Sequence, residues 1–132
     1  MYLVACGVLL AVATVLNLRD RRMLALTLAV GVNVFYSVPA QSQAAFYGTC
    51  IALELMVLTV AVFYTSRASC IAIYASCALV IVHFMGWTLD GSPPLSPYRV
   101  LVKLLECAQL VACVALSPVL TPKLRNRDAA PT

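Results

Sequence analysis

Residues 44–65, AAFYGTCIALELMVLTVAVFYT, and residues 68–89, ASCIAIYASCALVIVHFMGWTL, are long apolar runs separated only by Ser66 and Arg67. A helix needs about 20 apolar residues to cross the hydrocarbon core of a bilayer, which is about 30 Å thick. Each run is long enough to do so, and the break between them has room only for a tight turn. The stretch therefore predicts two antiparallel transmembrane helices.

Three further apolar runs flank this pair, at residues 1–18, 23–40 and 97–120. Together the runs predict an all-α polytopic membrane protein, a compact bundle of about five transmembrane helices over residues 1–122. Residues 123–132 are expected to form a short basic cytoplasmic tail. The composition agrees, because 63% of the residues are apolar and 11% are charged, whereas soluble domains are roughly half apolar and a quarter charged.

Most basic residues lie in the breaks that face one side of the predicted membrane. They are Arg19, Arg21, Arg22, Arg67, Lys123, Arg125 and Arg127. The breaks on the other side, residues 41–43 and 90–96, carry no basic residue. Because Lys and Arg mark the cytoplasmic side, the pattern predicts a multi-pass protein of the cell inner (plasma) membrane with its N-terminus outside and its C-terminus cytoplasmic. The basic residues are then topology anchors beside anionic lipid, and no nucleic-acid partner is expected.

Aromatic residues gather near the predicted outer boundary, a pattern typical of an interfacial belt. They are Tyr36, Phe46, Tyr47, Trp87 and Tyr98. This position predicts contact with lipid headgroups for these side chains.

Polar residues inside the last run share one helical face. Arg99, Lys103, Glu106, Cys113 and Ser117 follow steps of four, three, seven and four, with Gln109 one turn below Glu106. A charged side chain that faces lipid at the bilayer centre costs about 2.5–3.5 kcal/mol. This face is therefore expected to look into the bundle, into a neighbouring subunit or into water.

Other runs supply candidate partners at similar depth. At a rise of 1.5 Å per residue, Glu54 and Glu106 lie roughly 13–15 Å below the outer boundary, and Asn33, His83 and Lys103 roughly 9–10 Å below it. Ionisable groups inside a membrane are functional candidates. The sequence thus predicts a polar pathway or assembly site formed by Glu54, His83, Lys103, Glu106, Gln109 and Asn33, which the polar face of the fourth run (Ser69, Ser76, His83 and Trp87) would also approach.

Structural roles for the same residues stay open. Lys103 can extend to the headgroups or pair with Glu106, Glu54 can be neutral, and His83 can bond a carbonyl. The chain has one His and no His–Glu pair at helical spacing, so no metal site is expected. Its six cysteines contain no C-x-x-C motif, and no phosphate loop or nucleophile elbow occurs. We therefore expect neither an enzyme nor a cofactor.

Three classes of function fit the pattern. The first, which the sequence favours, is a self-associating pore or channel that uses the buried polar layer, and phage holins resemble this chain in their small size, several spans and short charged tail. The second is a non-catalytic accessory or assembly subunit bound to other membrane subunits. The third is a small proton-coupled transporter that uses Glu54, as small multidrug exporters use a buried Glu, although the aromatic and Gly pattern around that acid is absent here.

Overall fold

The computed structural model describes residues 1–36, 42–64, 66–88 and 96–121, and every regular element in these segments is helical. The helices are α1 (Tyr2–Asn17), α2 (Arg21–Phe35), α3 (Gln43–Phe63), α4 (Arg67–Thr88) and α5 (Ser96–Ala115). The predicted all-α bundle is therefore confirmed over the described residues. The predicted tail, 123–132, lies outside them.

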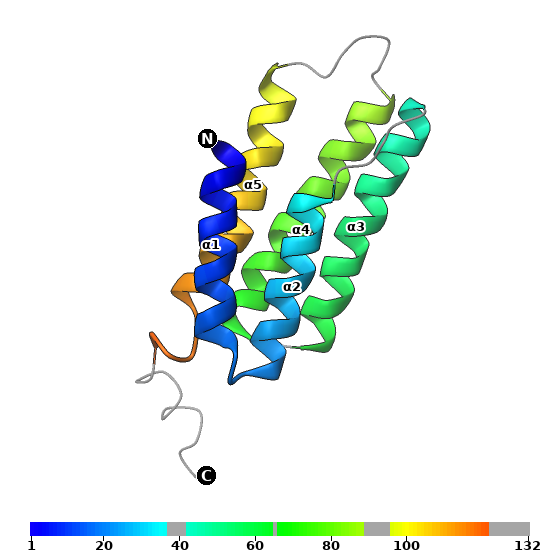
Figure 1. The fold of residues 1–132 in the computed structure, drawn as a ribbon. Helices are drawn as coiled ribbons and strands as arrows, with labels where there is room; N and C mark the ends of the chain where they lie inside the picture. The colour runs from blue at the N-terminus through cyan, green and yellow to red at the C-terminus, as the bar shows by residue number, and fades with distance from the viewer. Residues whose placement is uncertain (37–41, 65, 89–95, 122–132) are drawn as a thin grey trace.

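The helices form a closed ring in chain order. Each helix packs against the next, α5 packs against α1, and α2 also contacts α5 across the bundle (Figure 1). Successive helices run in opposite directions, so α1, α3 and α5 begin at one end of the bundle and α2 and α4 begin at the other (Figure 1). We call the end where α1 begins the Met1 end and the opposite end the Asn17 end.

Polar side chains cap the first turns of α2 and α3. The carboxylate of Asp20 accepts hydrogen bonds from the backbone N–H groups of Arg22 (3.0 Å) and Met23 (3.2 Å) at the start of α2. The hydroxyl of Ser42 accepts one from the N–H of Ala45 (3.2 Å) at the start of α3. These oxygens satisfy N–H groups that have no partner within the helix. The breaks thus define where α2 and α3 begin.

Two helices end earlier than the apolar runs predict. Helix α5 stops at Ala115, five residues before the predicted Leu120, and the chain then continues in turns. The reason is Pro118, which lacks an N–H and disfavours helical geometry in the residue before it. Helix α2 stops at Phe35 instead of Ala40, and Tyr36 has already turned to an extended backbone with ψ of 103°.

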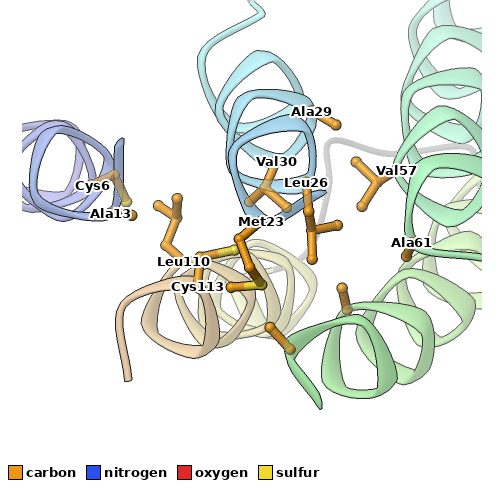
Figure 2. Close-up of a cluster of buried hydrophobic side chains, with 12 residues drawn as sticks. Cys6, Ala13, Met23, Leu26, Ala29, Val30, Val57, Ala61, Leu110 and Cys113 are labelled. Atoms are coloured by element: carbon orange, nitrogen blue, oxygen red, sulfur yellow. The ribbon is translucent and has the colours of Figure 1, made fainter. Parts of the chain in front are cut away.

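A buried apolar cluster fills the half of the bundle nearer the Asn17 end. Met23, Leu26 and Val30 of α2 lie next to Leu110 and Cys113 of α5, as Figure 2 shows. The facing positions on α1, α3 and α4 are small or branched: Ala13, Val57, Ala61, Ala68 and Ala72. Small residues let helix backbones approach closely and so pack well.

Buried polar residues and exposed large apolar residues occur together in this bundle. Buried polar or charged residues are Asn17, Thr27, Asn33, Glu54, Ser69, Ser76, His83, Gln109 and Ser117. Large apolar side chains are exposed on every helix, for example Val8, Leu28, Leu55, Ile81 and Leu104. Two helices contain segments long and apolar enough to cross a membrane, Ala44–Phe63 and Ala68–Thr88, whereas α1 is apolar but shorter.

Candidate functional site

Glu54 lies in the interior of the bundle, with 1% of its surface exposed. It is carried by α3, and the side-chain amide of Asn33 on α2 donates a hydrogen bond of 2.6 Å to its Oε1 atom. The contact joins two of the six residues that the sequence predicts for one site.

Gln109 of α5 and Ser76 of α4 complete this group from the other side. The Nε2 atom of Gln109 donates to the hydroxyl of Ser76 at 2.9 Å, and both side chains are fully buried. Both side chains lie near the carboxyl group of Glu54. We call Asn33, Glu54, Ser76 and Gln109 the central cluster. Four helices each contribute one polar side chain to it.

Two acceptor atoms of the central cluster have no hydrogen-bond partner. They are Oε2 of Glu54 and Oε1 of Gln109. Leaving a buried acceptor unsatisfied costs about 1–3 kcal/mol. A protonated carboxyl carries one O–H donor, and the amide oxygen of Gln109 is an acceptor. A proton on Glu54 would therefore add a donor to a cluster in which both unsatisfied atoms are acceptors.

His83 lies nearer the Met1 end and belongs to a second group. Its Nδ1 atom is 2.7 Å from the hydroxyl oxygen of Tyr98 on α5. The ring of Tyr98 also meets the ring of Tyr47 on α3, edge to face, with centroids 6.1 Å apart. We call Tyr47, His83 and Tyr98 the aromatic cluster. It links α3, α4 and α5 on the Met1 side of the central cluster.

Lys103 and Glu106 take part in a contact between α5 and α1. The hydroxyl of Tyr2 donates a hydrogen bond to Oε2 of Glu106. The Nζ atom of Lys103 lies 5.1 Å from the centroid of the Tyr2 ring, a cation–π geometry. One turn below, the thiols of Cys6 and Cys107 are 3.9 Å apart. Of the six predicted site residues, Asn33, Glu54 and Gln109 thus lie together, and the other three have different partners.

The polar face predicted for the fourth run is only partly turned inward. Ser69, Ser76 and His83 are buried, whereas Trp87 is exposed. The anchors Arg19, Arg21 and Arg22 are exposed at the Asn17 end, and Arg67 begins α4 at the same end. The remaining anchors, Lys123, Arg125 and Arg127, lie outside the described residues.

Several polar contacts have no counterpart in the sequence prediction. Tyr2 is missed as a partner of Glu106, and Tyr47 and Tyr98 are predicted to face headgroups although Tyr47 is buried and Tyr98 half-buried. The side chain of Asn17 donates to Thr27 and to the backbone carbonyl of Cys113. Its position near the end of an apolar run was the available signal.

Comparison with protein-family models, curated proteins and solved structures gives no significant match for this chain. The functional argument therefore rests on the site itself. Within the described residues, no group of three or more His, Cys, Asp or Glu side chains could hold a metal ion.

Proposed function

We propose that this chain is a five-span inner-membrane protein that carries protons across the membrane on Glu54. The observation that carries the proposal is the pair of buried acceptors in the central cluster, Oε2 of Glu54 and Oε1 of Gln109, which lack donors. A proton on this carboxyl group would give the pair a donor. Such a group can bind a proton and release it again during transport.

Five spans are supported by the surface of the bundle. Exposed Leu, Val and Ile side chains occur on all of the helices, including α1, α2 and α5, and large exposed apolar surfaces require a partner such as lipid. Helix α1 has 16 residues and so spans ~24 Å. A short span is tolerated when the bilayer thins or flanking side chains extend to the interface.

The charges of α5 are compatible with a membrane position. Arg99 and Lys103 are exposed and lie towards the Met1 end of the helix. Long basic side chains at such positions reach the headgroups while their carbon stems stay in lipid. The exposed Arg19, Arg21 and Arg22 at the opposite end support an orientation with the Met1 end outside and the Asn17 end cytoplasmic.

The part of the polar face of α5 towards the Asn17 end is buried, which favours proton transfer within one subunit over an oligomeric pore. Gln109, Cys113 and Ser117 are buried in a single subunit, where they contact other helices of the same chain. A pore lined by these residues would require the subunit to open, because the exposed part of the face, Arg99 and Lys103, lies only towards the Met1 end. An accessory subunit that binds its partner through these residues would also have to open, because the residues are buried.

The test is proton movement into liposomes that contain the purified protein. A membrane potential is imposed with a potassium gradient and valinomycin, and an enclosed pH-sensitive dye reports the flux. We expect wild-type protein to conduct above empty liposomes and Glu54→Gln to fall to that background. Gln keeps the size and the hydrogen bond from Asn33 but cannot bind or release a proton.

Glu106→Gln is the matched control, because it makes the same change at a residue bonded to Tyr2 outside the central cluster. It should retain most of the wild-type flux. Wild-type flux equal to that of empty liposomes, or equal fluxes for wild type and Glu54→Gln, would overturn the proposed function.

A further inference from the structure

We propose that the aromatic cluster of Tyr47, His83 and Tyr98 is the gate that closes the proton route between Glu54 and the Met1 end of the bundle. This inference rests on the proposed function and identifies the barrier on the Met1 side of Glu54.

On α3 and α4, the aromatic cluster lies about two helical turns from the central cluster, towards the Met1 end. Tyr47 precedes Glu54 by seven residues on α3, and His83 follows Ser76 by seven residues on α4. A spacing of seven residues is close to two helical turns, so each pair shares one face and is separated by about 10 Å. Because α3 and α4 are antiparallel, both steps lead from the central cluster towards the Met1 end.

Close contacts hold the aromatic cluster shut. Tyr47 is 3% exposed, and Gly86 allows its ring to approach α4. A Cβ atom at position 86 would lie 2.8 Å from Cε1 and 3.1 Å from the hydroxyl oxygen of Tyr47. On the other side, the 2.7 Å hydrogen bond between His83 and Tyr98 holds α4 to α5. The cluster therefore closes the space between three helices with side chains that can also bond water or a proton.

The opposite side of Glu54 holds both apolar and polar side chains. Between Glu54 and the Asn17 end, Met23, Leu26 and Val57 are each at most 2% exposed and belong to the buried cluster of Figure 2. Asn17 and Thr27 are fully buried in the same half and bond each other. Polar groups thus lie on both sides of Glu54, and the aromatic cluster is the barrier on the side of the Met1 end.

The test uses Tyr98→Phe in the same liposome assay. This variant keeps the ring that packs on Tyr47 and removes only the hydroxyl that bonds His83. A net hydrogen bond corresponds to roughly a fivefold to tenfold change in an equilibrium. We therefore expect proton flux to rise by about that factor. Tyr74→Phe is the matched control, because Tyr74 on α4 is 78% exposed and its flux should equal that of wild type.

Two further variants separate failure of the gate from failure of the proposed function. Gly86→Ala should also raise the flux, because its Cβ displaces the Tyr47 ring, and Tyr98→Phe combined with Glu54→Gln should return to background. If Tyr98→Phe and Gly86→Ala both match wild type while Glu54→Gln abolishes flux, the gate is wrong and the proposed function stands. If the raised flux of Tyr98→Phe persists without Glu54, the gate does not control a route through Glu54 and the inference is overturned.

Discussion

At the scale of single residues, Glu54 of α3 is buried and accepts a hydrogen bond from Asn33 of α2. Glu54, Asn33 and Gln109 are conspicuous because polar groups are costly within apolar runs, and they do lie together. Depth counting alone would separate Asn33 from Glu54 by several ångströms, yet their side chains bond. His83 is equally conspicuous, but its partner, Tyr98, also fits an interfacial belt. The rotation of each helix about its own axis decides which side chains pair, and this rotation cannot be read from a single sequence.

The protonation of Glu54 gives a prediction at this scale. Infrared spectra of the reconstituted protein at neutral pH should contain the C=O stretch of a protonated carboxylic acid. Glu54→Gln should remove this band and Glu106→Gln should retain it. Gln109→Leu should shift it to higher frequency, because the O–H group loses its acceptor. A band that survives Glu54→Gln unchanged would contradict a proton on Glu54.

At the scale of the helices, the apolar runs predict how many elements form but overestimate two of them. Apolar composition continues to Leu120, whereas the helical backbone of α5 ends at Ala115 because of Pro118. The order of packing is also not encoded in the runs, apart from the antiparallel neighbours that short breaks enforce. The contact of α2 with α5 across the ring is bridged by Asn17 of α1, which no periodic pattern singles out.

Asn17 provides the prediction for the packing of helices. Its side-chain amide donates to the hydroxyl of Thr27 on α2 (3.1 Å) and to the carbonyl of Cys113 on α5 (3.0 Å). Interhelical hydrogen bonds in membrane proteins contribute about 0.6 kcal/mol each on average and at most about 1.7 kcal/mol. Asn17→Ala should therefore lower the free energy of unfolding by about 1–3 kcal/mol, measured by titration with denaturing detergent.

The control for Asn17→Ala is Thr49→Ala. The Thr49 hydroxyl bonds only the carbonyl of Ala45 within its own helix (2.8 Å), so its loss should change the free energy of unfolding by a few tenths of a kcal/mol. Equal effects of the two substitutions would show that Asn17 does not link α1, α2 and α5 energetically.

At the scale of the whole molecule, the strongest prediction from the sequence is a membrane environment. Large apolar side chains lie both on the outside of the bundle and in its core, and several polar side chains are buried. Composition predicts the exposed apolar surface, whereas the closure of the ring and the separation of the six predicted site residues into three groups emerge only from packing.

The orientation of the molecule gives the last prediction. A fluorescent protein fused to the C-terminus should fold and fluoresce in the cytoplasm, whereas alkaline phosphatase at the same position should be inactive. Replacing Arg19, Arg21 and Arg22 with Ser removes the exposed charges at the Asn17 end and should increase the fraction of inverted molecules, because positive charge retains a loop in the cytoplasm. Replacing Arg99 with Ser, a charge at the opposite end of the bundle, should leave the orientation unchanged or strengthen it. An active phosphatase fusion to the wild-type chain would contradict an odd number of spans with the N-terminus outside, while leaving the helical bundle itself intact.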